Sequence, residues 1–216
     1  MRAVSPQPDT GRLQGLYAVT SEAICRSPDR LIAAAEEALA GGARLLQYRD
    51  KWNPRAQRER NAHALLGLCH AHAVPLIIND DPQLAADVGA DGVHVGASDA
   101  PLAQARELLG AAAIIGVSCS ASLERALAAE AGGASYVAFG RFFESRTKPD
   151  APPAPLPLLG EARKRLRIPV CAIGGITPAL APQAILAGAE LIAAVDGLFG
   201  AASIEAAARE YSRLFD

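Results

Sequence analysis

Residues 75–96, PLIINDDPQLAADVGADGVHVG, contain one complete strand–helix–strand unit. The apolar run PLIIND from Pro75 predicts a strand that is buried on both faces, and GVHVG from Gly92 predicts a second one. Between them, Asp81 followed by Pro82 indicates a helix start. The aspartate oxygen can accept a hydrogen bond from a first-turn amide, and proline has no amide to leave unpaired at the first helical position. Two strands connected through a helix form a parallel pair.

The same alternation continues along the whole chain in both directions. Six further strand candidates are GLYAVT (15–20), RLLQYRD (44–50), AIIGVSC (113–119), YVAFGRF (136–142), PVCAIGG (169–175) and LIAAVDGLF (191–199). Further helix starts are expected at Ser27-Pro28, Asn53-Pro54 and Thr177-Pro178, and helix stops at Gly41-Gly42, Gly110, Gly132-Gly133 and Gly188. About eight β/α units result.

Eight successive units with right-handed crossovers predict an α/β protein with a single (β/α)8 or TIM barrel of eight parallel strands. The alternative is an open doubly wound sheet. It is disfavoured because no dinucleotide fingerprint follows the first strand and nothing interrupts the repeat. We expect residues 1–13 to form a flexible N-terminal tail and residues 14–216 to form the catalytic barrel domain.

The amino-acid composition limits the kinds of molecule that the chain is expected to bind. Half of the 216 residues are hydrophobic, a fifth are charged and the formal net charge is -2, which is typical of a globular protein without a general attraction for nucleic acid. No apolar run approaches the roughly 20 residues that cross a bilayer. The four cysteines are widely spaced, which argues against a disulfide framework and zinc and favours a reducing, cytoplasmic location. We expect small-molecule partners, no nucleic acid and no membrane, and a homodimer is compatible with a barrel of this size.

In such a barrel, chemistry takes place at the carboxyl ends of the strands. The polar and glycine residues expected there are Gln47, Tyr48, Arg49, Asp50, Lys51, Asn79, Asp80, Asp81, His94, Asp99, Ser118, Ser145, Arg146, Thr147, Lys148, Gly174, Gly175, Val195, Asp196 and Gly197.

These residues separate into three sites on chemical grounds. The cations Arg49, Lys51 and Lys148, with Asn79 as a neutral polar group, suit a pyrophosphate better than a single carboxylate. Asp80 and Asp99 end adjacent strands and could share one Mg²⁺, which prefers one or two carboxylates plus phosphate oxygens and water. The Gly174-Gly175 turn and the turn at the eighth strand expose backbone amides that suit a single phosphate group.

Several of these residues have simpler structural interpretations. Arg49 and Asp50 could form an ordinary ion pair at a strand end. Asp81 is expected to be a helix cap rather than a ligand, and His94 is expected to pack in the barrel wall rather than bind metal. Trp52 could stack on a substrate ring or cover the barrel rim.

Seven strings, LYAVT, QYRDK, INDD, GADGVHVG, IIGVSCS, SYVAFGRFFESRTKP and PVCAIGGIT, resemble the thiamine-phosphate synthase family in order and spacing, from about Gly15 to Phe215. The resemblance implies Mg²⁺-dependent condensation of hydroxymethylpyrimidine pyrophosphate with methyl-hydroxyethyl-thiazole phosphate, giving thiamine phosphate and pyrophosphate. It implies that pyrophosphate leaves first and that the thiazole nitrogen captures a pyrimidine-methyl cation, so that no catalytic histidine is expected.

The resemblance also assigns roles. Gln47, Tyr48, Arg49, Asp50, Lys51 and Asn79 would hold the pyrimidine pyrophosphate, Asp80 and Asp99 would carry Mg²⁺, and Ser118 would contact the pyrimidine. Lys148 would stabilise the departing pyrophosphate, so that the catalytic set is Lys148, Arg49, Lys51 and Ser118. The thiazole phosphate would be bound by Ser145, Arg146, Thr147, Gly175, Val195 and Asp196.

The chain departs from the family pattern at four positions: Ser145 stands for the usual Thr, Arg141 for a common Pro, Ala97 for a common Gln and Asp196 for the usual Ser. We expect the Asp196 amide to bind phosphate while its carboxylate points away, because a carboxylate facing the phosphate would repel it.

Two other functions are compatible with the same barrel. A thiazole tautomerase would need neither the paired carboxylates nor the cations, and it is thought to use a histidine after the fifth strand, where this chain has CSAS from Cys119. A non-catalytic barrel that binds a thiamine precursor would be expected to have lost Asp80, Asp99 or Lys148, which are all present.

Overall fold

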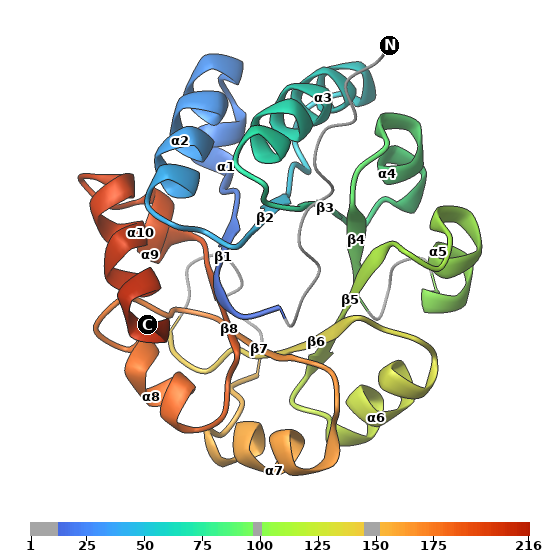
Figure 1. Cartoon of the computed structure of the whole chain (residues 1–216), viewed down its shortest axis with the longest axis vertical. Helices are drawn as coiled ribbons and strands as arrows, with labels where there is room; N and C mark the ends of the chain where they lie inside the picture. The colour runs from blue at the N-terminus through green and yellow to red at the C-terminus, as the bar shows by residue number, and fades with distance from the viewer. Residues whose placement is uncertain (1–12, 97–100, 145–151) are drawn as a thin grey trace.

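The computed structural model describes residues 13–96, 101–144 and 152–216, and in this part of the chain the strands form one closed parallel barrel. The strands follow one another around the barrel in chain order (Figure 1), which confirms the predicted fold class. They are Gly15–Val19 (β1), Leu45–Tyr48 (β2), Leu76–Asn79 (β3), Gly92–Val95 (β4), Ile114–Ser120 (β5), Tyr136–Phe139 (β6), Val170–Ile173 (β7) and Leu191–Ala194 (β8).

The barrel closes where the first strand pairs with the last one. Gly15 lies opposite Leu191 and Ala18 lies opposite Ala194, in parallel register. Every strand therefore has a hydrogen-bonded neighbour on both sides, and all carboxyl ends meet at one mouth.

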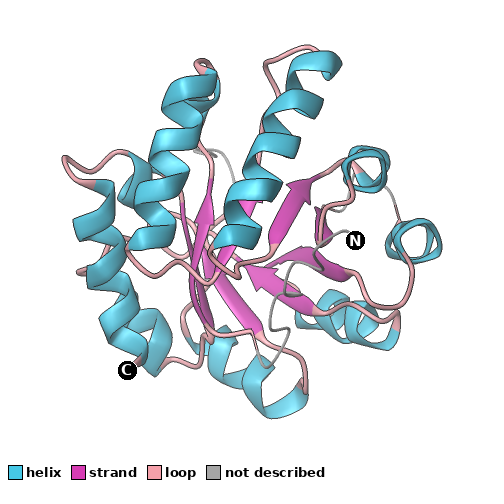
Figure 2. Ribbon diagram, turned by 45° about the horizontal axis from the view of Figure 1, so that its top comes forward, coloured by secondary structure: helices cyan, strands magenta, loops and turns pink. Residues whose placement is uncertain are grey.

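Helices surround the barrel on the outside, as Figure 2 shows with helices in cyan and strands in magenta. They are Glu22–Cys25 (α1), Pro28–Ala40 (α2), Arg55–Ala71 (α3), Pro82–Val88 (α4), Leu102–Leu109 (α5), Leu123–Ala131 (α6), Pro157–Arg165 (α7), Ala181–Leu186 (α8), Asp196–Phe199 (α9), Ile204–Ser212 (α10) and the 3₁₀ turn Arg213–Phe215 (η1). Within the described ranges, none of these helices has both the length and the apolar character that a bilayer span requires.

Successive side chains along each strand divide the core into two layers. In β1, Leu16 and Ala18 pack outward in the large cluster between barrel and helices, whereas Tyr17 and Val19 pack in a smaller cluster inside the barrel. Leu13 packs against the inner cluster, and the rest of the predicted tail lies outside the described residues.

Two predicted helix starts are wrong, and several predicted strands, the eighth most of all, extend beyond the observed ends. Helix α3 begins at Arg55 with Pro54 at the cap position, because Asn53 donates its side-chain amide to Cys25 O instead. A turn follows Thr177, whose carbonyl accepts from Leu180 N and Ala181 N, so that α8 begins only at Ala181. The eighth strand ends at Ala194, and the residues from Asp196 onward form α9 rather than strand.

The other two helix starts lie where the sequence predicts them. Ser27 precedes Pro28 at the start of α2, although its side chain forms no capping hydrogen bond. The Asp81 carboxylate caps α4 by accepting from Leu84 N at 2.8 Å.

Candidate active site

A cavity of about 390 Å³ opens among the carboxyl ends of the strands. This volume lies in the range of small-molecule sites. The residues predicted at the mouth that line it are Gln47, Arg49, Asn79, His94, Ser118, Gly174, Gly175, Val195, Asp196 and Gly197. The structure thus brings together residues from β2, β3, β4, β5, β7 and β8.

Strand β2 divides the predicted substrate-binding run 47–51 between two sides of the barrel wall. Gln47 and Arg49 line the cavity, whereas Tyr48 packs in the outer cluster. The Tyr48 hydroxyl donates to Asp50 Oδ2 at 2.7 Å and accepts from Asn61 Nδ2 of α3 at 3.2 Å. The Tyr48 side chain therefore points away from the cavity and supports the contact between β2 and α3.

The Asp50 carboxylate organises the loop between β2 and α3. It also accepts from the backbone amides of Trp52 and Asn53, each at 3.0 Å, and from Asn53 Nδ2 at 2.8 Å. Burial alone would raise the pKa of Asp50, but the hydrogen bonds from Tyr48, Asn53 and Trp52 outweigh it and hold the pKa below the ordinary 3.8. In the described part of the chain, Asp50 forms no ion pair with Arg49.

Arg49 is held at the mouth by contacts of its backbone and of its guanidinium group. Its amide donates to Thr20 Oγ1 at 2.7 Å, and the Thr20 hydroxyl donates to Arg49 O at 3.1 Å. The guanidinium carbon lies 5.4 Å from the centre of the Trp52 ring, a cation–π distance. Trp52 thus packs beside a cavity-lining cation at the barrel rim.

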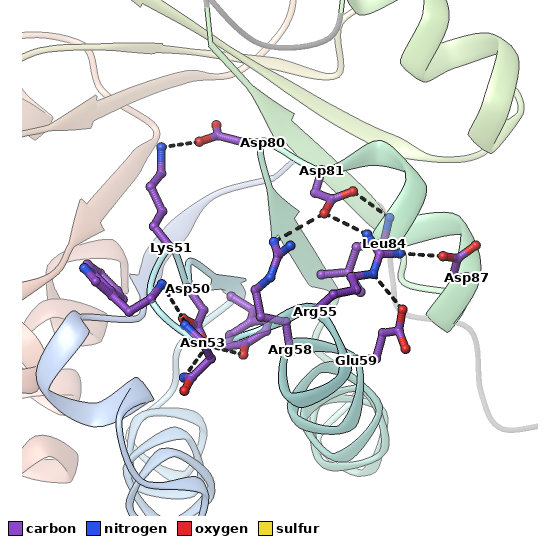
Figure 3. A network of polar contacts seen from close by, with 12 residues as sticks. Asp50, Lys51, Asn53, Arg55, Arg58, Glu59, Asp80, Asp81, Leu84 and Asp87 are labelled. Carbon is purple, nitrogen blue, oxygen red and sulfur yellow. Dashed lines mark hydrogen bonds and ion pairs between the residues drawn. The ribbon is translucent and has the colours of Figure 1, made fainter.

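A second, polar cavity of about 400 Å³ adjoins the first one at Asn79, which lines both. Its lining consists of Asp50, Lys51, Asn53, Arg58, Asn79, Asp80 and Asp81. Lys51 Nζ lies 2.5 Å from Asp80 Oδ2, and Figure 3 shows the two side chains pointing toward one another. A predicted pyrophosphate cation and a predicted magnesium ligand thus share this cavity.

Asp80 has a backbone conformation that is uncommon for a residue with a side chain. Its φ is 63°, in the left-handed region, while its amide donates to His94 O at 2.8 Å. Such conformations persist where the surrounding structure holds them, and they occur often at functional sites. The turn directs the Asp80 carboxylate toward Lys51.

Asp81 is a helix cap, as the sequence predicts, and it also joins α3 to α4. Its Oδ2 lies 3.0 Å from Arg55 Nη1 and 3.3 Å from Arg58 Nη1 (Figure 3). Both carboxylate oxygens of Asp81 therefore have protein partners.

A chain of buried hydrogen bonds forms the floor of the first cavity. Gln47 Nε2 lies 2.6 Å from Tyr17 Oη, Tyr17 Oη lies 2.6 Å from Tyr136 Oη, and Tyr136 Oη lies 2.9 Å from His94 Nδ1. His94 Nε2 then lies 2.8 Å from Ser118 Oγ. Burial raises the pKa of both tyrosines far above the ordinary value.

Tyr17 and Tyr136 were not predicted as site residues from the sequence, and His94 was expected to pack in the wall rather than bind metal. His94 is buried at 7% exposure, but its ring lies inside the barrel with both nitrogens hydrogen-bonded. Gly116 leaves the space for this chain, because a Cβ atom there would lie 2.1 Å from Tyr136 Cζ. The alternation of side chains along a strand was the available signal, because it puts the polar residues of this chain, from five strands, on the inner face of the barrel.

The predicted turn for a single phosphate lies at the far side of the cavity. Gly175 has φ 65°, and a Cβ atom there would lie 2.0 Å from Glu144 O, so that only glycine fits. The start of α9 lines the same cavity with Val195, Asp196 and Gly197. The first amides of a helix have no intrahelical partner and are suited to bind an anion.

Six predicted residues lie outside the described part of the chain: Ala97, Asp99, Ser145, Arg146, Thr147 and Lys148. The pairing of Asp80 with Asp99 and the placement of Lys148 therefore stay predictions. Within residues 13–96, 101–144 and 152–216, no three metal-binding side chains gather in one place.

Comparisons with known proteins agree on one family. The family described as thiamine monophosphate synthase matches residues 16–198. The chain is 53% identical to the thiamine-phosphate synthase of Methylococcus capsulatus, over 94% of this chain and 89% of that protein. It is also 53% identical to the thiamine-phosphate synthase of Thioalkalivibrio sulfidiphilus, over 96% and 99%.

Among solved structures, the thiamine phosphate pyrophosphorylase from Pyrococcus furiosus is similar with a TM-score of 0.84 and 32% identity, covering 93% of this chain and 95% of that one. A 3-hexulose-6-phosphate synthase at 20% identity and a TM-score of 0.63 shares the fold alone.

Proposed function

The chain belongs to the thiamine-phosphate synthase family and condenses hydroxymethylpyrimidine pyrophosphate with thiazole phosphate, and from this premise we propose how the two adjoining cavities divide the substrates. The pyrimidine ring lies on the buried floor near Gln47 and Ser118. Its pyrophosphate extends past Asn79 into the polar cavity. The observation that carries this proposal is Asn79, which lines both cavities.

The pyrophosphate is bound by cations on both sides of this junction. Arg49 lines the first cavity, and Lys51 and Arg58 line the second. Arginine can grip phosphate oxygens with two parallel hydrogen bonds, and lysine supplies a compact charge. Lys148, by family resemblance, adds a further charge on the departing group.

The residues present fit magnesium. Asp80 places a carboxylate in a polar cavity, and its ion pair with the Lys51 ammonium at 2.5 Å supports a position for a cation there. Mg²⁺ prefers such hard oxygen ligands, completed by water and phosphate oxygens. Asp80 and Asp99 would hold it. When bound, Mg²⁺ neutralises negative charge on the pyrophosphate.

The thiazole phosphate binds at the opposite side of the mouth. Backbone amides at Gly175, Val195 and Asp196 receive its phosphate, with Ser145, Arg146 and Thr147 adding contacts from the loop after β6. This proposal is supported by the glycine turn and the start of α9 in one cavity lining.

In the reaction, the bond between the pyrimidine methylene carbon and the pyrophosphate oxygen breaks, and its electron pair leaves with pyrophosphate. The thiazole nitrogen then donates its lone pair to the pyrimidine-methyl cation and forms the new carbon–nitrogen bond. Arg49, Lys51 and Lys148 accelerate the first step because they bind the growing negative charge more strongly than the ground state. The nitrogen carries no proton that must be removed, so that no general base is required.

Neither alternative function is retained. The relatives at 53% identity are synthases rather than tautomerases or binding proteins. The four cysteines are free and buried, which supports a location of the protein in a reducing compartment such as the cytoplasm. A homodimer stays a prediction.

The test is pyrophosphate release by the purified protein with both substrates, first with Mg²⁺ and then with a chelator. We expect release that requires both Mg²⁺ and the thiazole phosphate and yields thiamine phosphate. Undiminished release under chelation, in protein stripped of metal, would contradict the magnesium assignment at Asp80.

A further inference from the structure

The buried hydrogen-bond chain on the cavity floor has a direction that its end groups determine. Tyr17 is 1% exposed and Tyr136 is 0% exposed, so that their hydroxyl hydrogens need partners inside the protein. Among the described residues, the hydrogen-bond partners of the Tyr17 hydroxyl are Gln47 Nε2 and the Tyr136 hydroxyl. A side-chain amide nitrogen only donates, so that the Tyr17 hydrogen is directed to Tyr136 Oη.

The same reasoning passes along the chain to the imidazole ring. Tyr136 Oη accepts from Tyr17, and its own hydrogen therefore points to its other neighbour, His94 Nδ1 at 2.9 Å. A ring nitrogen that accepts a hydrogen bond carries no proton. His94 is then the neutral tautomer with its proton on Nε2, and Nε2 donates to Ser118 Oγ at 2.8 Å.

At the end of the chain, Ser118 Oγ accepts from His94 and keeps its own hydrogen. Ser118 lines the cavity, and His94 is the only hydrogen-bond partner of its hydroxyl among the described residues. We propose that Tyr17, Tyr136 and His94 are positioning residues that hold His94 as the Nε2–H tautomer and thereby make the Ser118 hydroxyl a hydrogen-bond donor into the cavity. The inference rests on the proposed function, because it assigns to Ser118 an acceptor atom of the pyrimidine, an unprotonated ring nitrogen.

The direction of the chain determines which ligand atoms are accepted. If the hydrogen bonds were donated in the opposite direction, the Ser118 hydroxyl would donate its hydrogen to His94 Nε2. Only the lone pairs of Ser118 Oγ would then face the cavity. Such a floor would disfavour an unprotonated ring nitrogen, because two acceptors would meet without a hydrogen. The three positioning residues thus act on specificity through Ser118.

The first test measures the tautomer in the unmodified protein. Nitrogen-15 NMR of the full-length chain labelled at histidine distinguishes a protonated Nε2 from a protonated Nδ1. His94→Gln identifies the His94 signals by their loss, leaving those of His63, His70 and His72. We expect the neutral Nε2–H form, and a neutral Nδ1–H form would overturn the inference without any kinetic measurement.

The second test separates positioning from stability. Tyr136→Phe keeps the ring but removes the donor to His94, and we expect KM for the pyrimidine pyrophosphate to rise about tenfold, with KM for the thiazole phosphate unchanged. Tyr211→Phe is the matched control, because it removes an equally buried hydroxyl that donates to Ile176 O at 2.8 Å outside the inner cluster. The control should leave KM for the pyrimidine pyrophosphate unchanged, and equal effects of both variants would contradict the inference.

Conservative replacements of His94 provide a third readout. His94→Gln keeps an N–H donor in reach of Ser118, whereas His94→Asn keeps an acceptor for Tyr136 and loses that donor. We expect KM for the pyrimidine pyrophosphate to stay closer to wild type in the Gln variant. If the wild type turns over but the two variants are reversed in order, the positioning inference fails while the proposed function stands. If the wild type releases no pyrophosphate, the proposed function fails, and the tautomer is still measured by NMR.

Discussion

Arg49 and Asp50 are neighbours in the chain, but their side chains line different cavities. Arg49 lines the cavity, whereas Asp50 holds Tyr48 and the loop that leads into α3. The residues of the QYRDK run therefore have two different roles. A substitution at Arg49 should act on substrate, and one at Asp50 should act on the fold.

Lys148 is the residue whose role rests most on family resemblance. Lys148→Ala should lower kcat by a factor of about 10²–10³, the scale of losing one preorganised charge that stabilises a leaving group. Steady-state kinetics of pyrophosphate release measures this loss. Lys164→Ala, at an exposed position of α7, is the matched control and should keep wild-type kcat. A Lys148→Ala variant that retains most of its activity would remove Lys148 from the catalytic set.

A substitution of Asp196 tests whether its backbone amide or its side chain contacts the thiazole phosphate. If the amide binds phosphate and the carboxylate points away, Asp196→Ser should change KM for the thiazole phosphate by less than about twofold. A carboxylate about 4 Å from the phosphate would instead repel it by on the order of 1 kcal/mol, or about fivefold in KM. A fivefold fall in KM in the Ser variant would therefore place the carboxylate against the phosphate.

Two residues of the cavity floor could not be predicted as site residues from the sequence. Tyr17 and Tyr136 are 119 residues apart, and each is an ordinary aromatic residue in an apolar strand. Only closure of the barrel brings their hydroxyls to 2.6 Å. Among the described residues, Tyr136 and Ser118 bond to the His94 ring, and they come from strands whose register the sequence does not specify.

Among the helices, a predicted start is correct where the capping side chain stays available to the first turn. Asp81 caps α4 as its spacing to Pro82 predicts. Asn53 stands in the same context before Pro54, but its side chain bonds to Cys25 O and Asp50 instead. Tertiary partners thus override a local signal of equal strength.

The Asp81 cap gives a stability prediction. Asp81→Ala should lower the free energy of unfolding by about 1 kcal/mol, because Leu84 N loses its acceptor. Asp81→Asn should retain most of that stability, since an amide oxygen also caps. Urea unfolding with an unchanged m-value measures both variants. Equal losses in the two variants would assign the stability to the ion pairs with Arg55 and Arg58 instead.

The Asp50 carboxylate in the loop between β2 and α3 should make the free energy of unfolding depend on pH. The pKa of Asp50 is lowered in the folded state, so that its ionised form contributes stability above the unfolded pKa, about 3.8. This contribution is lost as pH falls through the folded pKa. The difference in unfolding free energy between wild type and Asp50→Asn should therefore be constant near neutral pH and shrink below about pH 4.

Denaturant unfolding at a series of pH values measures that difference. Asp29→Asn, at an exposed position of α2, controls for the loss of one negative charge. A wild-type advantage over Asp50→Asn that grows on acidification would reverse the sign and contradict the hydrogen-bond argument.

At the scale of the whole molecule, the fold could be predicted almost completely because one unit repeats. Each β/α unit carries its own strand and helix pattern, so that an error in one boundary, such as α9 read as strand, does not change the topology. The mouth was predictable for the same reason, since carboxyl ends of parallel strands must converge. The division into two cavities that share Asn79 depends on side-chain volumes and was not predictable.

Because β1 to β8 close into one barrel, a ligand bound at the mouth should stabilise the entire fold. Pyrophosphate with Mg²⁺ at about 100 times the dissociation constant should raise the unfolding free energy by about 2.7 kcal/mol, visible as a higher Tm. Pyrophosphate alone should give a smaller shift, because only the cations near Asn79 would then bind it, without a metal ion held by Asp80. In Asp80→Asn the additional shift from Mg²⁺ should disappear while the shift from pyrophosphate alone remains, which separates the metal ligand from the anion site. If Mg²⁺ raised the Tm equally in Asp80→Asn and wild type, the metal would bind elsewhere, and the coupling of Asp80 to pyrophosphate would be refuted.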